Sequence, residues 1–284
     1  MSATERARRT AVFLLLLLVI LGSIALLIFV IPPDATAPGR TADEEESPER
    51  EPEAPVSPPI EREPEKGDKI YLVVDDAGHD VAELKPYLSL PVPLTVAVLP
   101  GRKESQVVVK AALAAGKEII LHLPMEPVGK ADPGAGAIRS DQTDEEIRSI
   151  LRSHLEDLPG IIGVNNHMGS RATADSRVMD VVMSVLAEEG LFFLDSRTTA
   201  KSVAREAAKR HGVAFRERNV FLDNDRSDDA VLRQLSEAAT LAGKEGYSVA
   251  IGHVTSPTVA RAVAKHHAEL ARKGIAVAPL SELF

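Results

Sequence analysis

Two adjacent carboxylates follow a short apolar run near residue 70, and this pair is the clearest sign of chemistry in the chain. The run Ile70–Val74 has the composition of a buried strand, and Asp75, Asp76 and Gly78 come directly after it. Successive side chains on a strand point to opposite faces, so both carboxylates can serve one site only if the strand breaks up there. The pair therefore predicts a site in which one carboxylate binds a metal ion and the other takes a proton.

Histidines near the ends of later apolar runs are further candidate metal ligands. His122 lies within the run Glu118–Leu123, with Glu126 four residues beyond it, and His167 lies in the polar stretch Asn165–Ser170. A buried histidine bonded to backbone is the default for a run like the first, but the strand-end position and the nearby carboxylate favour a ligand. A tight polar loop has little packing role, which favours His167 as well. Imidazole nitrogens with carboxylate oxygens suit zinc and its neighbours.

Other polar residues follow later apolar runs and have two interpretations each. Asn165 and Asn166 either shape a turn or orient metal ligands. Asp195 ends the run Leu191–Asp195, and Arg197 comes two residues later. The arginine either pairs with Asp195, binds a carboxylate or orients Asp75. All of these residues become candidates for the same site if the strands that precede them are parallel neighbours.

The remaining candidates are histidines and one aspartate. His253 follows the run Tyr247–Gly252 and is either a structural histidine or a general acid. Asp223 suits the plainer role of a helix N-cap. His79 is close to the carboxylate pair in sequence and stays a weak candidate. Four histidines lie on the surfaces of expected helices and receive no site role: His154, His211, His266 and His267.

The elements that must position these residues alternate along the chain from Lys69 onward. Expected strands are Ile70–Val74, Leu94–Leu99, Glu118–Leu123, Ile161–Asn165, Leu191–Asp195, Val220–Leu222, Tyr247–Gly252 and Ile275–Pro279. Expected helices are Glu104–Ala115, Thr143–Leu158, Asp175–Glu189, Lys201–His211, Ser227–Lys244 and Thr258–Lys273. This order predicts an α/β fold with a parallel sheet, closed into an irregular seven- or eight-stranded (β/α) barrel. In such folds the site lies at the carboxyl ends of the strands, where the polar residues gather.

The N-terminal end of the chain is built differently. Residues 11–31 are apolar and uncharged, which is long enough to span a bilayer core of ~30 Å. Arg6, Arg8 and Arg9 precede this stretch, so we expect residues 1–10 in the cytoplasm and the rest exported to the periplasm or the extracellular face. A cleaved signal peptide is the alternative, with a small-x-small site at 35–37. The apolar run exceeds the roughly 7–15 residues of a signal h-region, which favours a retained anchor.

Composition divides the exported part into a linker and a domain. Residues 32–68 are rich in Pro and Glu and predict a disordered, extended linker. Eleven acidic and three basic residues lie between Thr41 and Asp68, a net charge of −8 against −9 for the whole chain. The domain at 69–284 is thus close to neutral and lacks the basic footprint of a nucleic-acid partner. The chain has no Cys, which excludes disulfides and thiolate ligands.

The motifs of residues 69–284 resemble those of the divergent branch of the polysaccharide deacetylase family. A typical member has Thr-Phe-Asp-Asp-Gly, and this chain has Val73–Gly78 in that place. A later motif runs from Gly-His-Glu-Ile to His-x-x-x-His, and here Gly116–Ile119 leads to His122 and Glu126. The stretch 165–170 replaces an Arg-Pro-rich turn, the fourth motif keeps its Asp without its Trp, and the last keeps its His.

The resemblance implies roles for these residues. Asp75 would be the general base and His253 the general acid, while Asp76 and His122 would bind the metal. The third metal ligand is either His167 or Glu126. Asp195 and Arg197 would belong to the catalytic set.

The resemblance also implies an activity. It is hydrolysis of N-acetyl groups on a cell-envelope polysaccharide or oligosaccharide, with zinc or a similar divalent ion. A catalytically inactive, membrane-tethered domain that binds sugar or protein is the alternative. It is favoured by Glu126 in place of the last His of the His-x-x-x-His motif and by the missing Trp. A tethered scaffold with a vestigial site is a third interpretation.

Overall fold

The structure is a computed structural model, and it describes residues 67–284. All nine strands in these residues belong to one sheet, and every pair of neighbouring strands is parallel. The strands are β1 (Asp68–Ala77), β2 (Thr95–Val98), β3 (Glu118–Met125), β4 (Gly163–Met168), β5 (Phe192–Asp195), β6 (Phe215–Glu217), β7 (Val220–Phe221), β8 (Tyr247–His253) and β9 (Ile275–Ala278). The expected parallel α/β class is therefore correct.

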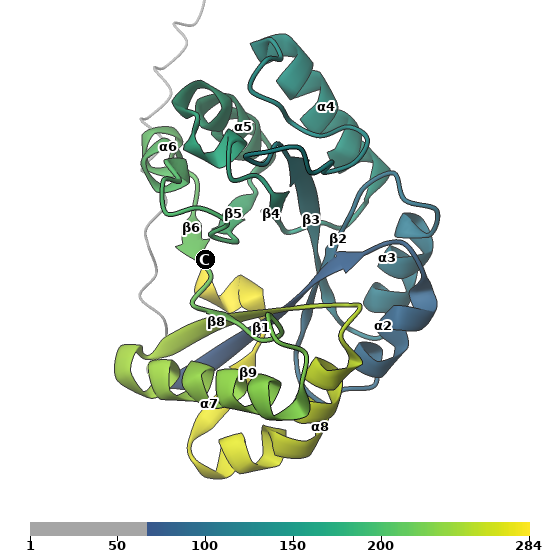
Figure 1. The fold of residues 1–284 in the computed structure, drawn as a ribbon, viewed down its shortest axis with the longest axis vertical. Coiled ribbons are helices and arrows are strands. Elements are labelled where there is room, and N and C mark those ends of the chain that lie inside the picture. The colour runs from purple at the N-terminus through teal and green to yellow at the C-terminus, as the bar shows by residue number, and fades with distance from the viewer. Residues whose placement is uncertain (1–66) are drawn as a thin grey trace, which may run out of the picture. The chain divides into compact units, whose positions relative to one another are not determined.

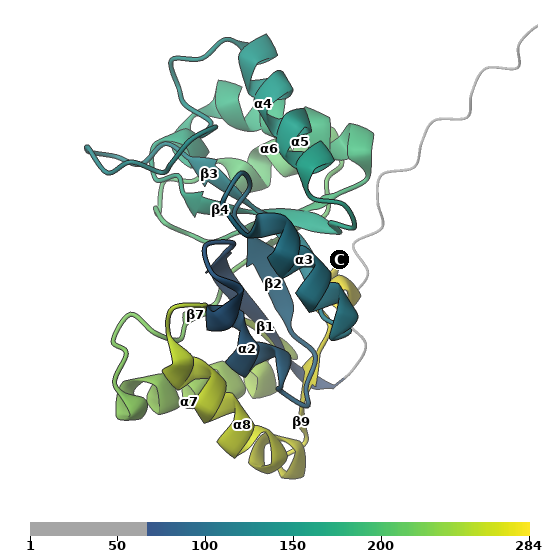
Figure 2. The same ribbon diagram turned by 90° about the vertical axis from the view of Figure 1, so that its right-hand side faces the viewer.

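Helices alternate with the strands and lie on the outside of the curled sheet (Figure 1, Figure 2). They are α2 (Val81–Leu88), α3 (Ser105–Ala114), α4 (Asp144–Asp157), α5 (Ser176–Glu189), α6 (Ala204–His211), α7 (Asp228–Glu245) and α8 (Pro257–Arg272), with short 3-10 turns at Ala172–Ala174 and Leu280–Leu283. The sequence pattern did not indicate α2, because Pro86 lies inside it and proline normally ends a helix.

The sheet is an open half-barrel and not the closed barrel that the sequence predicted. Its strand order is β6-β5-β4-β3-β2-β1-β8-β7, and β9 pairs with the first half of β1. The two edge strands, β6 and β7, are separated by Arg218 and Asn219 alone. Parallel pairing needs a crossover of a dozen or more residues, so β6 and β7 cannot pair with each other. Arg218 and Asn219 instead connect the two edges of the sheet: Arg218 N donates to Asp195 O on β5, and Asn219 N donates to Val249 O on β8.

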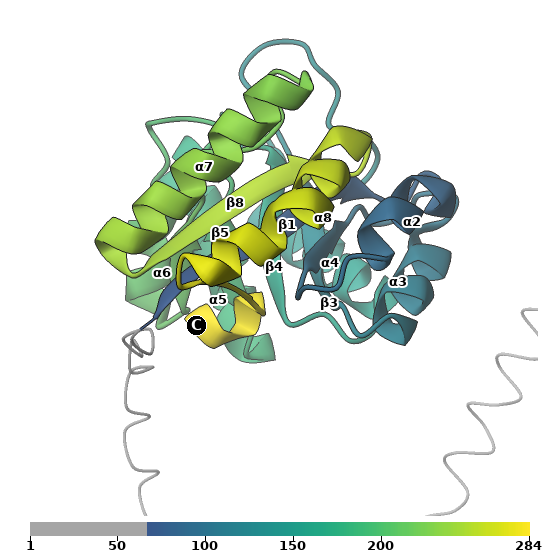
Figure 3. The ribbon, with the colours of Figure 1, turned by 90° about the horizontal axis from the view of Figure 1, so that it is seen from below.

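Alternating residues of β1 divide the core into two layers. Ile70, Leu72 and Val74 pack with the helix-facing cluster, whereas Tyr71 and Val73 face the interior of the half-barrel. The residues of both layers are buried along this strand. Figure 3 shows α7 and α8 lying against β8 and β1 on the outer side of the sheet. A strand fixed on both faces holds the two carboxylates at its end in a defined position.

The structure does not describe the first part of the chain. Among residues 67–284, none of the helices has the length and hydropathy needed to cross a membrane. The expected cytoplasmic segment 1–10, the span at 11–31 and nearly all of the linker at 32–68 lie outside the described residues.

Candidate metal centre

A bulge at the end of β1 lets both carboxylates reach the same site. The pairing register of β1 with β2 shifts between Val74 and Ala77, and Asp76 adopts a left-handed conformation with φ 65°. Aspartate is among the residues that tolerate this region of conformational space. As a result Asp75 Oδ2 lies 3.7 Å and Asp76 Oδ1 3.2 Å from the same nitrogen, Nε2 of His122. Strain of this kind commonly occurs at functional sites.

Three side chains from three strands meet at this point. Oδ1 of Asp76 on β1 lies 2.9 Å from Nδ1 of His167 on β4, and 3.2 Å from Nε2 of His122 on β3. The two imidazole nitrogens are 3.2 Å apart. Zinc bonds of about 2.0–2.2 Å place the ligand atoms of a tetrahedral site roughly 3.3–3.6 Å apart. The three separations here are slightly shorter, so this donor set fits a divalent ion of the zinc type after a small outward shift of the side chains. We call Asp76, His122 and His167 the metal triad.

The end of β4 is fixed by its own network. Met168 has φ 55°, and its carbonyl accepts hydrogen bonds from Asn166 Nδ2 at 2.7 Å and Thr198 Oγ1 at 2.8 Å. Asn166 Oδ1 accepts from Ser196 N at 2.9 Å. Asn166 therefore ties the turn after His167 to the end of β5 and does not touch the triad.

Asn165 connects the triad with Asp75. Its Nδ2 donates to Asp75 Oδ1 at 2.8 Å, and its Oδ1 lies 2.8 Å from His122 Nδ1. An amide oxygen can only accept, so Nδ1 of His122 carries a proton in both the neutral and the charged ring, and Nε2 is the nitrogen that faces the triad. Both Asn165 and His122 are buried, with exposed fractions of 0% and 2%. This contact fixes the tautomer in which His122 can bind a metal.

The charges at the site are strongly coupled. Burial raises the pKa of the Asp75 carboxyl, and the charges of His122 and His253 offset this effect only in part. Burial works against ionisation of Asp76 as well, but hydrogen bonds and charges from His122 and His167 hold its pKa far below the usual range. Burial lowers the pKa of His122, yet Asp75 and Asp76 outweigh it and raise that pKa to about 9. Without an ion, a charged imidazolium thus lies between two carboxylates.

His253 at the end of β8 is held by an aspartate. Asp223 accepts from His253 N at 2.9 Å and lies 2.8 Å from its Nδ1. Burial lowers the pKa of His253, but the hydrogen bond and charge of Asp223 raise it overall. Val254 N donates to the Asp75 carbonyl at 2.9 Å, which ties the ends of β8 and β1 together. The sequence pattern of Asp223 indicated a helix cap, but α7 begins five residues later, with Ser227 at its N-cap position.

Asp195 and Arg197 lie next to the site without contacting the triad. Asp195 accepts from Arg197 N at 2.7 Å and from Ser202 Oγ at 2.6 Å. The guanidinium of Arg197 binds the carboxylate of Glu217 at 2.7 Å, so of the three alternatives the structure shows binding to a carboxylate and not a contact with Asp75. Arg218, which the sequence did not single out, stacks on Phe221: its Cζ atom lies 3.8 Å from the centroid of the ring.

Glu126, the alternative third ligand, has other partners. Its carboxylate accepts from the backbone N and Oγ of Ser140, at 2.8 and 2.6 Å, and pairs with Arg171 at 3.4 Å. His79 is exposed. His154, expected on a helix surface, is buried and lies 2.8 Å from the Gly136 carbonyl.

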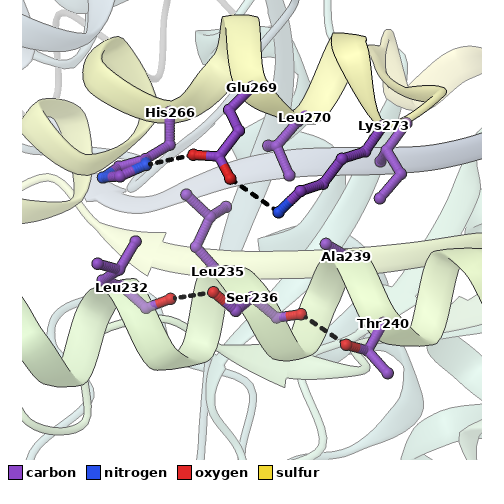
Figure 4. Close-up of a pocket in the computed structure, with 10 residues that line it drawn as sticks. Leu232, Leu235, Ser236, Ala239, Thr240, His266, Glu269, Leu270 and Lys273 are labelled. Atoms are coloured by element: carbon purple, nitrogen blue, oxygen red, sulfur yellow. Dashed lines mark hydrogen bonds and ion pairs between the residues drawn. The ribbon is translucent and has the colours of Figure 1, made fainter.

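A separate groove lies between α7 and α8 and has a volume of about 390 Å³ (Figure 4). Leucines and alanine form its floor, and Glu269 bridges His266 and Lys273 along its rim. None of the metal-triad residues lines this groove. It is therefore not part of the candidate metal centre.

A parallel half-barrel with an Asp/His/His cluster at the carboxyl ends of its strands defines a deacetylase-like α/β fold with a possible metal site. The chain belongs to the Divergent polysaccharide deacetylase family, whose pattern matches residues 72–284. This match confirms the resemblance derived from the motifs.

Two relatives and one solved structure are similar to this chain. An uncharacterized protein from Haemophilus influenzae is 35% identical over 192 residues, 68% of this chain and 69% of that protein. The uncharacterized protein YibQ of Escherichia coli is 35% identical over 191 residues, and the match spans only 60% of its length. Among solved structures, an uncharacterized Agrobacterium tumefaciens protein shares the fold with a TM-score of 0.70 and 24% identity, over 77% of this chain and 90% of that one.

Proposed function

We propose that this protein is a metal-dependent deacetylase that removes N-acetyl groups from a cell-envelope polysaccharide or its fragments. The observation that carries the proposal is the metal triad with the buried carboxylate of Asp75 beside it, 3.7 Å from His122 Nε2. Membership of a polysaccharide deacetylase family supports the substrate class. Two imidazoles and one carboxylate form one of the ligand sets that hold zinc in catalytic sites, so zinc is the ion we propose.

Asp76, His122 and His167 would hold the ion. A divalent ion at such a site supplies Lewis-acid chemistry: it polarises an acyl oxygen and lowers the pKa of water. The three ligands come from β1, β3 and β4. In the sheet β3 and β4 are neighbours and only β2 separates β3 from β1, so the ligand positions depend on backbone pairing and not on mobile loops. Three protein ligands leave room for water and substrate.

Asp75 would act as the general base. Its carboxylate accepts a hydrogen bond from Asn165 at 2.8 Å, which fixes its direction. Burial raises the pKa of this carboxyl, which brings it closer to the working range of a base. In the proposed reaction Asp75 takes a proton from the water that attacks the acetyl carbon.

His253 would act as the general acid. Its Nδ1 is held by Asp223, so Nε2 is left to face a substrate. The hydrogen bond and charge of Asp223 raise the pKa of His253, which favours the protonated ring that a general acid needs. It donates that proton to the amine nitrogen as the C–N bond breaks and acetate leaves.

We also propose that residues 11–31 anchor the protein in a membrane, with the catalytic domain on the exported side. The support is the uncharged apolar run, the arginines that precede it and the acidic segment that follows. An envelope polysaccharide would be within reach of such a domain.

Acetate release by the full-length protein tests the proposal. We expect zinc-dependent release from N-acetylated oligosaccharides, loss of activity with chelator and recovery on adding zinc. Asp75→Asn should lower kcat at least about 100-fold, because a positioned base contributes 10²–10⁴. Its zinc content should be retained, since the triad is intact. Asp225→Asn, at an exposed carboxylate that binds Ser227, is the matched control. Full activity of Asp75→Asn would show that Asp75 is not the general base.

A non-catalytic glycan-binding domain is the second candidate. It is favoured by the charges of the site, which offset one another without an ion: the imidazolium of His122 already pairs with Asp75 and Asp76. The two candidates differ in metal content. A purified protein that folds normally, binds oligosaccharide and takes up no zinc would support the second.

A further inference from the structure

The turn after β2 brings a cationic side chain next to the end of β1. Arg102 lies in this turn, and a Cβ atom built on Gly78 would lie 3.4 Å from the Cβ of Arg102. Glu104 N donates to the Gly78 carbonyl at 3.0 Å, so the turn is fixed to the segment that follows β1. Gly78 is two residues beyond the triad residue Asp76. The side chain of Arg102 therefore begins beside the segment that directly follows Asp76.

The far end of the same side chain rests on the segment between β3 and α4. A Cβ atom at Gly134, where φ is 100°, would overlap Nη2 of Arg102. Only a glycine leaves space for the guanidinium there. The two ends of Arg102 thus touch the segments that follow β1 and β3, and those strands carry Asp76 and His122. Figure 2 shows the segment after β3 extending outward from the sheet.

The guanidinium of Arg102 has no partner within the described residues. Its Nε is buried and has no hydrogen-bond acceptor there, and no carboxylate of residues 67–284 pairs with it. Nearby acids are engaged elsewhere: Glu104 accepts from Val81 N at 2.8 Å, and Asp132 from Gly134 N at 3.0 Å. Holding a partly buried cation without a counter-ion costs stability, and buried polar groups in proteins almost always have partners.

We propose that Arg102 forms an anion subsite that binds a carboxylate on the glycan, next to the sugar whose acetyl group enters the metal centre. A guanidinium fork matches a carboxylate with two parallel hydrogen bonds, and a partly exposed Arg102 can offer its terminal nitrogens. The inference rests on the proposed function for the location of the glycan. It makes the substrate an acidic N-acetylated glycan and not a neutral one.

Binding of two matched ligands tests this subsite without hydrolysis. The ligands are an N-acetylated oligosaccharide with a single carboxylate and its methyl ester, which has nearly the same shape and no charge. The full-length, zinc-loaded protein carries Asp75→Asn so that neither ligand is consumed, and each dissociation constant is measured by calorimetry. We expect the acid to bind about 10-fold more tightly than the ester.

Variants at two neighbouring cations separate charge recognition from packing. Arg102→Gln should bring the acid and the ester within about 2-fold of each other, and Arg102→Lys should keep part of the preference. Lys103→Gln should leave the ratio unchanged, because that side chain is 86% exposed and lies 3.7 Å from Glu104. If Arg102 merely packs the segment after β3, Arg102→Gln weakens both ligands equally and the ratio stays at its original value.

The outcomes also distinguish this subsite from the proposed function. A protein that releases acetate but binds acid and ester equally would overturn the subsite alone. A protein that prefers the acid through Arg102 but never releases acetate would support the subsite and refute the deacetylase. Absence of measurable binding of either ligand would overturn the subsite.

Discussion

Nδ1 of His122 lies 2.8 Å from Oδ1 of Asn165, and this contact decides which nitrogen of the ring faces the metal triad. The amide of Asn165 is itself oriented, because its Nδ2 donates to Asp75 at 2.8 Å. One residue thus sets both the tautomer of a ligand and the direction of the base. A side chain that only shaped a turn, which was the alternative from the sequence, would not link the two.

Asn165→Ala should weaken zinc binding about 10- to 100-fold, as loss of partners behind metal ligands typically does. His122 loses the acceptor that fixes its ring, and Asp75 loses its donor. Zinc affinity is measured by competition with a chelator of known affinity. Asn224→Ala, at an exposed position after β7, is the control. Equal zinc affinity in wild type and Asn165→Ala would show that Asn165 does not support the ligand.

Stability of the metal-free protein should depend on pH through His122. The pKa of this histidine is about 9 in the folded chain against 6.5 for the ordinary side chain. The imidazolium therefore stabilises the fold fully below about pH 6.5, and this contribution is lost as pH rises through 9. It amounts to roughly 3 kcal/mol at most. Urea unfolding of chelator-treated wild type and His122→Gln between pH 6 and 10 measures it, and parallel pH curves for the two proteins would contradict the assignment.

Asp223→Asn should shift the pH profile of acetate release. The hydrogen bond and charge of Asp223 raise the pKa of His253. Asparagine has one acceptor oxygen where Asp223 uses two, for Nδ1 and for the backbone N of His253, and it also removes the charge. His253 should therefore lose its proton at lower pH. The alkaline limb of the kcat profile then moves to lower pH. Asp195→Asn serves as a comparison, since Asp195 binds Ser202 and Arg197 and has no contact with His253. An unchanged alkaline limb in Asp223→Asn would show that His253 is not the general acid.

Gly163→Ala should destabilise the protein by about 1–3 kcal/mol. Gly163 begins β4, and a Cβ there would overlap the ring of Phe192 on the neighbouring strand β5. The same substitution at Gly243 in α7 is the matched control. There the nearest atom would be 3.6 Å away, so alanine should stabilise the helix by about 0.5–1 kcal/mol. Urea midpoints of the two variants should move in opposite directions, and similar midpoints would contradict the packing of β4 on β5.

Strands with long apolar runs and the polar residues at their ends were predictable from the sequence. The run 70–74 identified β1, and the rule that parallel strands place sites at their carboxyl ends brought His122 and His167 to the same place. The short β6 was not predictable, because Phe-Arg-Glu is half polar and only three residues long.

Two features of the site depend on tertiary structure. The left-handed conformation of Asp76 comes from a register shift against β2, which no local pattern encodes. Asp223 follows a two-residue strand, and its partner His253 lies 30 residues away. A lone aspartate in that position is more often a helix cap, and here a long-range contact outweighs that local preference.

The central claim is that Asp76, His122 and His167 bind one divalent ion. A crystal structure of the zinc-loaded protein, with anomalous diffraction measured at the zinc edge, tests it most directly. The account predicts one strong peak about 2.0–2.2 Å from Asp76 Oδ1, His122 Nε2 and His167 Nδ1, with Glu126 still bound to Ser140. A peak coordinated by Glu126, or none at the triad of fully zinc-saturated crystals, would contradict it.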